Sequence, residues 1–353
     1  MRKKEFFMQN MPLSQPILRL TQDTIAFAYL YNVNPDKEIL DVDFNGYKVL
    51  PVDMFRERYV DHLYNLTAYQ MYAIENLVIG LTPEYVLIAT KLPNGKGGFD
   101  DLYDIDPNLI FGAFVNTILY FRLHTSSDLQ MGTFFISYVG NTKPAYRNIQ
   151  HTDFGCLVPK LQYVGYDLIR EPVVISLAKT IQIAEFILKF DSKKLSEESE
   201  LLLALITFNR ACNTSDAFYK ITGFVTVLES LLAGDGKEGE ISFKLRTRLV
   251  YILKNPHIAK FVRDIYGIRS AIAHVGGFNK RAKSDYAEFT EPKFLFDQIK
   301  ILESLCQQTI LYFMHNFVEK DKFNIQNIIS ELDKEIFEKV GKTEEVVDDL
   351  NSL

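Results

Sequence analysis

The sequence predicts an α+β protein in which an N-terminal mixed α/β domain is followed by an all-α antiparallel helical bundle. Segments rich in β-branched and aromatic residues lie in the first half, as strands do. Amphipathic helices joined by short polar loops fill the second half. At 353 residues the chain favours two domains. We place these at residues 1–170 and 171–320, with a C-terminal helix and acidic tail at 321–353.

Strands are expected in the N-terminal domain at residues 16–32, 85–92 and 131–139, each close to turn-forming residues. Asp106 followed by Pro107 predicts the start of a helix that runs to about residue 123. The aspartate can cap the first turn, and proline is tolerated at the first helical position because that position has no backbone partner for an N–H. The pattern predicts no strand order.

Helices in the C-terminal half are predicted from capping residues and prolines. Ser196 and Asp216 are expected to cap two of them, and Pro172, Pro256 and Pro292 to precede three others. The predicted ranges are 172–190, 196–211, 216–232, 242–254, a helix after 256 that carries residues 269 and 274, 292–318 and 325–340.

The net charge of −6 is unevenly distributed. Residues 237–290 hold 11 Lys and Arg against 5 Asp and Glu, a local charge of +6, so the rest of the chain carries −12. A basic segment on an acidic protein favours binding of a polyanion at one place.

Three cysteines at distant positions argue against a disulfide framework and against a zinc site. The first residues contain no apolar run long enough for a signal peptide. The longest apolar run, residues 109–123, is interrupted by Asn116, Thr117 and Arg122, which argues against a membrane span. We therefore expect a cytoplasmic protein that has no membrane partner.

Arg269 and His274 lie five positions apart near the end of one predicted helix, just before Gly276 and Gly277. A guanidinium binds phosphate through a planar fork of donors, and an imidazole transfers protons near neutral pH. Five positions turn a regular helix by about 140°, so the two side chains do not share a face. The pair would converge if the helix loosened near His274, or if a two-fold axis brought two copies together.

The segment from Tyr266 to His274 resembles the Y-x-x-R-S-x-x-x-H signature of HEPN domains, in particular the ApeA-like branch of bacterial defence proteins. Ser270 follows the arginine, as it does in ApeA-like members. Residues 201–211, 224–232 and 243–249 resemble the first long helix, the Leu-Glu-x-Leu-Leu helix and the short basic helix of that family, in the family order.

The resemblance implies a homodimeric, metal-independent endoribonuclease without a cofactor, acting as an anti-phage, abortive-infection or toxin effector. Its catalytic set here would be Arg269, His274 and Ser270. The 2′-OH of RNA would attack the neighbouring phosphate while His274 serves as general base or acid and Arg269 neutralises the developing charge. The alternative is a non-catalytic HEPN module that dimerises and binds a nucleotide, RNA or protein.

The basic segment supplies the residues expected to bind the RNA backbone, and the alternative for each is an ordinary solvated helix face. These residues are Lys244, Arg246, Arg248 and Arg263.

Two further residues are expected to support the site. Tyr266 belongs to the signature, and Glu229 lies within an apolar helix stripe, where a structural ion pair or a helix cap is favoured over a role as a base. For the N-terminal domain two roles stay open: a sensor that binds a ligand or a phage protein, or a scaffold that steadies the dimer.

Overall fold

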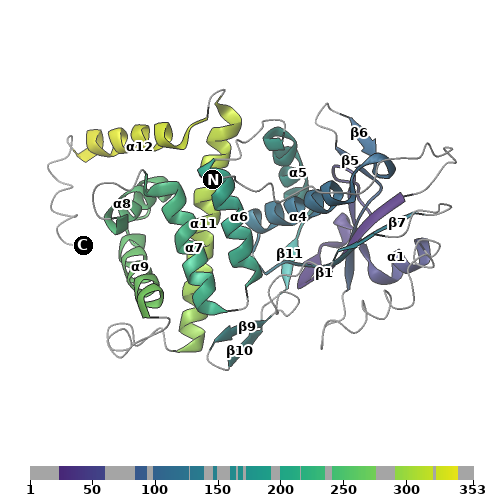
Figure 1. The fold of residues 1–353 in the computed structure, drawn as a ribbon, viewed down its shortest axis with the longest axis horizontal. Coiled ribbons are helices and arrows are strands. Elements are labelled where there is room, and N and C mark those ends of the chain that lie inside the picture. The colour runs from purple at the N-terminus through teal and green to yellow at the C-terminus, as the bar shows by residue number, and fades with distance from the viewer. Residues whose placement is uncertain are drawn as a thin grey trace, which may run out of the picture.

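The computed structural model describes most of both halves of the chain. The described residues are 24–59, 84–93, 98–126, 128–138, 146–148, 160–163, 166–169, 172–191, 199–214, 216–234, 241–275, 291–320 and 323–340. Within them an N-terminal sheet is followed by a helical C-terminal region, which confirms the predicted α+β class (Figure 1).

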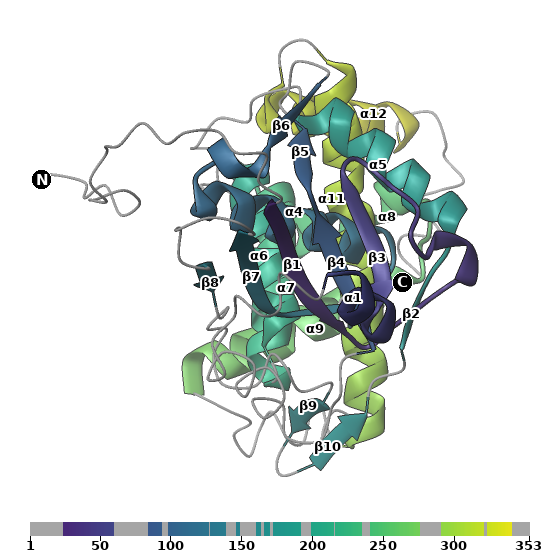
Figure 2. The same cartoon turned by 90° about the vertical axis from the view of Figure 1, so that its right-hand side faces the viewer.

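The main sheet has five antiparallel strands in the order β3-β4-β1-β7-β8. These are β1 (Thr24–Tyr31), β3 (Tyr47–Pro51), β4 (Tyr85–Ala89), β7 (Gln130–Tyr138) and β8 (Tyr146–Asn148). The central strand β1 lies between β4 and β7, and all eight of its residues are buried (Figure 2). Because side chains alternate between the two faces of a strand, both faces of this sheet are covered.

Aromatic side chains fill the core on the two faces of the sheet. On one face, Phe27 of β1 stacks on Phe135 of β7 at 5.1 Å between ring centroids. Phe27 also packs at 4.7 Å against Phe55 of helix α1 (Val52–Arg58). On the other face, Phe134 contacts Phe114 of helix α4 at 4.9 Å.

Helix α4 (Pro107–His124) begins as the sequence predicts. The carboxylate of Asp106 accepts a hydrogen bond from the backbone N–H of Asn108 at 2.7 Å, and Pro107 occupies the first turn. This cap satisfies a backbone donor that has no partner within the helix.

Short elements connect the main sheet to its surroundings. They are β2 (Val33–Pro35), η1 (Lys37–Ile39), β5 (Lys91–Pro93), β6 (Phe99–Asp101), η2 (Leu102–Asp104), β9 (Lys160–Tyr163), β10 (Tyr166–Ile169) and β11 (Val173–Ile175).

Strand β11 pairs in parallel with β2. The helix predicted from residue 172 is therefore wrong at its start, since it begins at residue 177. Two valines and an isoleucine at 173–175 favour an extended strand once β2 is there to pair with.

The helical region contains α5 (Leu177–Asp191), α6 (Glu200–Asn213), α7 (Ala217–Leu232), α8 (Ile241–Leu253), α9 (Ile258–Val275), α11 (Pro292–Glu319) and α12 (Ile325–Val340). Asp216 caps α7 as predicted. The cap of α6 is Ser199, three residues beyond the predicted Ser196, which lies outside the described residues. Helix α7 packs against α6, α8, α9 and α11 (Figure 1).

Arg122 joins the sheet half to the helical half. Its side chain is 2% exposed, and it donates to the carbonyl of Leu129 at 2.8 Å, to Gln130 at 3.1 Å and to Asn209 of α6 at 2.6 Å. The amide of Gln307 in α11 donates to the carbonyl of Arg122 at 2.6 Å. One hydrophobic cluster also runs from the sheet into the helices. The predicted boundary near residue 170 stays a prediction, and residues on both sides of it share this core.

None of the helices in the described ranges is long and apolar enough to cross a membrane.

Candidate functional site

Helix α9 directs Arg269 toward α7. Ile258, Val262, Ile265 and Ile268 are buried and repeat every three or four positions, so they form the inward stripe of α9. Arg269 follows Val262 by seven positions, about two turns, and therefore starts from the same side of the helix.

On α7, Glu229 meets Arg269. The Nη2 atom of Arg269 donates a hydrogen bond to Oε2 of Glu229 at 3.0 Å. The hydroxyl of Tyr266, one turn before Arg269, also donates to this carboxylate, and the Arg269 guanidinium lies 6.0 Å from the Tyr266 ring centroid. The structure brings these three predicted residues together, and Glu229 forms an ion pair, which is one of the two structural roles expected for it.

Burial and the nearby positive charge shift the pKa of Glu229 in opposite directions. Burial raises the pKa of Glu229, and the nearby Arg269 charge and the hydrogen bonds from Tyr266 and Arg269 only partly oppose that rise. Burial also raises the pKa of Tyr266, and the negative charge of Glu229 adds to the increase. The carboxylate is therefore less easily ionised than an ordinary glutamate.

Arg269 is fixed by its ion pair with Glu229 but stays partly exposed to solvent. Its side chain is 29% exposed, against 17% for Glu229. Its Nε atom is buried and has no hydrogen-bond partner among the described residues. A guanidinium has five N–H donors, so an exposed edge remains that can bind a phosphate after one donor is used by Glu229. Because the ion pair has no net charge, long-range attraction of RNA must come from other basic residues.

The expected loosening of the helix between Arg269 and His274 is not seen in the described backbone. Helix α9 continues through Val275, so it does not loosen at His274 in the described backbone. The hydrogen-bond pattern of the helix is maintained to that point, which leaves the two positions about 140° apart. Ser270 is half-buried, next to Arg269. The side chain of His274, together with Gly276 and Gly277, lies outside the described residues.

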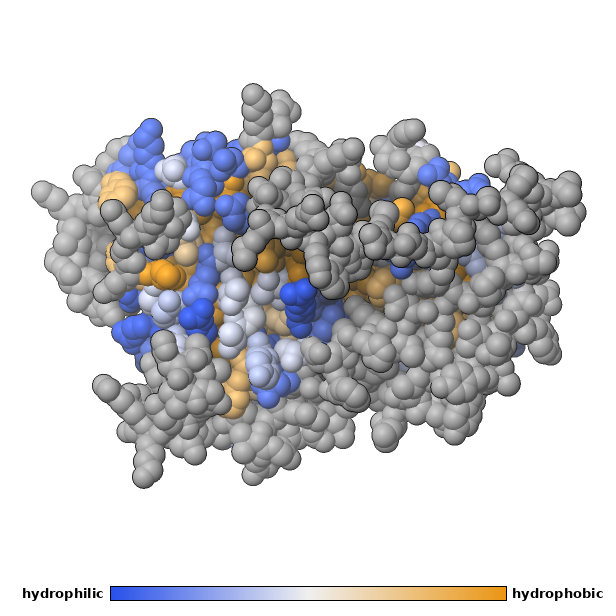
Figure 3. All heavy atoms as spheres, viewed as in Figure 1, coloured by the Kyte–Doolittle hydropathy of each residue, from blue (hydrophilic) through white to orange (hydrophobic). Residues whose placement is uncertain are grey.

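Three residues of the predicted RNA-binding set lie at least partly exposed on α8 and α9. Arg263 is half exposed and pairs with Asp264 at 3.2 Å. Arg246 donates from Nε to the Ser242 carbonyl at 3.4 Å, and Lys244 is half-buried on the same helix. In the view of Figure 3, hydrophilic side chains are spread over the described surface of the helical region.

The fourth residue of that set, Arg248, is contradicted by the structure. It is 6% exposed, and its guanidinium makes two hydrogen bonds to Asp333 of α12, at 2.8 and 2.7 Å. It also donates to the carbonyl of Leu232 at the end of α7. Arg248 therefore joins α8 to α7 and α12, and its donors are not available to a phosphate. A sequence signal existed, because Arg248 lies between the buried Leu245 and Leu249.

Asp333 is a residue that the sequence reasoning missed. It follows the buried Leu332 on α12, an amphipathic helix whose apolar side also includes Ile325, Ile328 and Ile329. An acid at the edge of an apolar stripe is a candidate partner for a buried arginine. The sequence position of Asp333 does not show which arginine that partner is.

In the parts of the chain that the structure describes, no group of three or more His, Cys, Asp or Glu side chains is placed to hold a metal ion.

Comparison of the chain with models of known protein families, with characterised proteins and with solved structures found no match.

Proposed function

We propose that the chain is a HEPN-like, metal-independent endoribonuclease whose site is centred on Arg269. The observation that carries this proposal is the ion pair of Arg269 with Glu229, which holds a partly exposed guanidinium on the helix that also carries His274. The resemblance adds support, since α6, α7, α8 and α9 overlap the four segments that resemble the family, in the same order.

The chemistry requires a ribose 2′-OH, so RNA is cleaved and DNA is not. The 2′-oxygen forms a bond to phosphorus while the bond from phosphorus to the 5′-oxygen breaks. His274 accepts the proton of the 2′-OH, and a second His274 gives a proton to the departing 5′-oxygen. Arg269 stabilises the negative charge that develops on the phosphoryl oxygens. The products are a 2′,3′-cyclic phosphate and a 5′-hydroxyl.

This mechanism requires a dimer. Because α9 stays helical through Val275, positions 269 and 274 of one chain are on different sides of the helix. A two-fold axis beside this helix would place Arg269 of one copy near His274 of the other, and would supply both the base and the acid. Light scattering should therefore report a dimer at micromolar concentration. A monomer that retains full ribonuclease activity would contradict this geometry.

One observation favours a second function, a non-catalytic module that binds RNA, a nucleotide or a protein. Glu229 neutralises Arg269 within the site and would repel a phosphate that approaches from its side. In a purely structural role the pair would join α7 to α9 and nothing more. The two functions differ in whether the purified protein cleaves RNA at all.

The decisive experiment is incubation of the purified full chain with total RNA in EDTA. We expect cleavage with 2′,3′-cyclic phosphate ends, and we expect a substrate with a 2′-deoxy sugar at the cleaved position to be resistant. Arg269→Ala and His274→Ala should each lower the rate by a factor of about 10² to 10⁴.

Arg56→Ala is the control, because Arg56 carries the same charge but is exposed on α1, in the N-terminal half, and belongs to neither the Glu229 cluster nor the predicted RNA-binding set. Its cleavage rate should stay within a few-fold of the wild type. Full activity in well-folded Arg269→Ala and His274→Ala proteins would exclude this site. RNA binding without cleavage by the wild type would favour the second function.

A further inference from the structure

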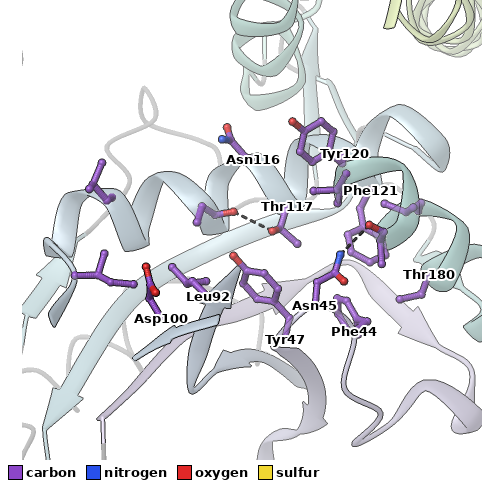
Figure 4. Close-up of a pocket in the computed structure, with 16 residues that line it drawn as sticks. Phe44, Asn45, Tyr47, Leu92, Asp100, Asn116, Thr117, Tyr120, Phe121 and Thr180 are labelled. Carbon is purple, nitrogen blue, oxygen red and sulfur yellow. Dashed lines mark hydrogen bonds between the residues drawn. The ribbon is translucent and has the colours of Figure 1, made fainter. Parts of the chain in front are cut away.

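A pocket of about 300 Å³ lies in the N-terminal half, away from the Arg269 cluster (Figure 4). Helix α4 forms one wall and helix α5 another, and the turn between η1 and β3 closes the base. That volume is roughly ten times the share of one water molecule in the liquid and lies at the lower end of small-molecule sites.

The pocket is built from ordered elements. Asn45, in the turn, donates from Nδ2 to the carbonyl of Ala184 in α5 at 2.8 Å, so the turn is tied to the opposite wall. Asn45 and Gly46 have φ angles of 55° and +83°, and the Gly46 N–H donates to Asp43 at 2.9 Å. This left-handed turn places Asn45 at the base of the pocket (Figure 4). The walls therefore exist before any ligand binds.

The lining is mainly apolar and rich in rings. Phe44, Tyr47, Tyr120 and Phe121 contribute four aromatic rings, and aliphatic side chains from α4 and α5 complete the walls. Ring faces of this kind favour stacking or edge contacts with a planar ligand.

The charged residues of the pocket lining limit which class of ligand can bind. None of the described residues that line the pocket is a Lys, Arg or His, and Asp100 is the one acid among them. An anionic ligand such as a nucleotide or a carboxylate would lose its hydration without gaining a counter-charge. The amide of Asn45 keeps an oxygen that can accept a hydrogen bond, and the exposed Asn116 offers a second amide.

We propose that this pocket is a binding site for an uncharged small molecule with up to three aromatic rings. The proposal is independent of the ribonuclease activity, since it uses none of the residues at Arg269.

Two dyes with the same rings test the size and charge of the site. Phenylnaphthylamine is uncharged, and anilinonaphthalenesulfonate adds a sulfonate to the same skeleton. Added to the purified full chain, the uncharged dye should bind saturably with one dye per chain. The sulfonated dye should bind about tenfold or more weakly, because its charge would be desolvated beside Asp100 without a cationic partner.

Two substitutions on α4 test whether the dye binds in this pocket. Ala113→Leu adds methyl groups to the pocket wall and should weaken binding of the uncharged dye about tenfold or more. Gly112→Leu adds a larger side chain to the neighbouring position, which does not line the pocket and faces open space, and should leave binding unchanged.

The absence of tryptophan from the chain gives a second way to locate the dye, without filling the pocket. Leu109 lines the pocket and is 62% exposed. Phe337 is 76% exposed and belongs to α12, which lies on the other side of the helical region from α4 in Figure 1. A single tryptophan introduced by Leu109→Trp should transfer excitation energy to the bound dye, and one introduced by Phe337→Trp should transfer much less.

Each of four results would overturn the proposal: dye binding that does not saturate, equal affinity for the two dyes, Ala113→Leu protein that is folded and binds normally, or equal energy transfer from both tryptophans. If Ala113→Leu does not fold, the energy transfer and the comparison of the two dyes still decide it.

Discussion

Arg269 on α9 and Glu229 on α7 form an ion pair with 3.0 Å between Nη2 and Oε2, and both side chains are partly buried. The pKa of Glu229 is nevertheless raised, because loss of hydration disfavours the carboxylate more than the Arg269 charge and the hydrogen bonds from Tyr266 and Arg269 stabilise it. A partly buried pair of this kind contributes little net stability, and its role is to hold the guanidinium in one orientation.

The first prediction separates the charge of Glu229 from its hydrogen bonds. A raised pKa means that the folded state favours the protonated acid, so ionisation of Glu229 lowers stability as the pH rises through that pKa. Glu229→Gln imitates the neutral form and should change the free energy of unfolding at pH 7 by less than about 0.5 kcal/mol, or increase it. Glu229→Ala removes the acceptor for Tyr266 and Arg269 and should cost about 1 to 2 kcal/mol.

Urea unfolding of the two variants beside the wild type measures these changes. A loss of stability in Glu229→Gln as large as that in Glu229→Ala would show that the charge, and not the hydrogen bonds, stabilises the contact between α7 and α9.

The second prediction concerns Arg248. Arg248→Ala would leave Asp333 and the carbonyl of Leu232 without their donor, and should lower the free energy of unfolding by about 2 to 4 kcal/mol. Arg248→Lys should recover only part of this, because an ammonium group cannot make the two parallel bonds to one carboxylate. Hydrogen exchange should show faster exchange in α12.

Arg246→Ala is the matched control, two positions away on α8, where the half-buried side chain donates to the Ser242 carbonyl and lies 5.9 Å from the ring centroid of the exposed Phe243. Its effect should stay within about 0.5 kcal/mol. Equal costs for the two alanine variants would contradict the structural role of Arg248.

Local sequence signals predicted several helix boundaries, although the starts of α5 and α6 differ from the prediction. Asp106 with Pro107, and Asp216, define the starts of α4 and α7, because a capping side chain acts on backbone groups two or three residues away. Residues 325–340 were predicted as a helix, and α12 has those bounds, which follow an apolar stripe of helical period.

Features that depend on distant partners were not predictable. Residues 173–175 form a strand because β2, far away in the sequence, provides its hydrogen-bond partners. Arg248 belonged to the basic segment by composition, and although its place between Leu245 and Leu249 indicated burial, that position did not identify Asp333 of α12 as its partner. Glu229 was expected to form an ion pair or a helix cap, and spacing alone did not identify Arg269 as its partner.

The third prediction concerns the salt dependence of RNA binding. If Lys244, Arg246 and Arg263 contact the phosphate backbone, the logarithm of affinity should fall linearly with the logarithm of salt concentration. Replacing all three with glutamine should make the slope shallower by about 0.7 per lost contact, or about 2 in total. His274→Ala should leave the slope unchanged, because it mainly removes chemistry.

Three exposed basic residues elsewhere, Lys37, Arg56 and Lys189, provide the control for total charge. Their triple glutamine variant should keep the wild-type slope. Equal slopes in all proteins, or the same reduction in both triple variants, would mean that the basic segment is a solvated surface.

The last prediction concerns pH and His124, at the end of α4. Burial lowers its pKa from an ordinary value of 6.5 to about 4, and the positive charges of Lys179 and His315 add to the decrease. Its Nε2 atom is buried without a hydrogen-bond partner among the described residues, and its ring lies 5.8 Å from that of Phe186. The folded protein therefore holds this histidine neutral in mildly acidic solution.

An unfolded chain takes up a proton at His124 near pH 6.5, whereas the folded chain does so only near pH 4. Between these values the unfolded state binds more protons, so the free energy of unfolding must fall as the pH decreases from about 6.5 to about 4. His124→Phe keeps the ring beside Phe186 and cannot titrate. It should be more stable than the wild type at pH 5 by about 1 to 2 kcal/mol, allowing for partial exposure, with little difference at pH 8. Thermal unfolding of both proteins across this range, with His257→Phe at an exposed position as the control, measures the difference. A wild type and a His124→Phe protein that lose stability in parallel on acidification would show that His124 is not held neutral by its surroundings.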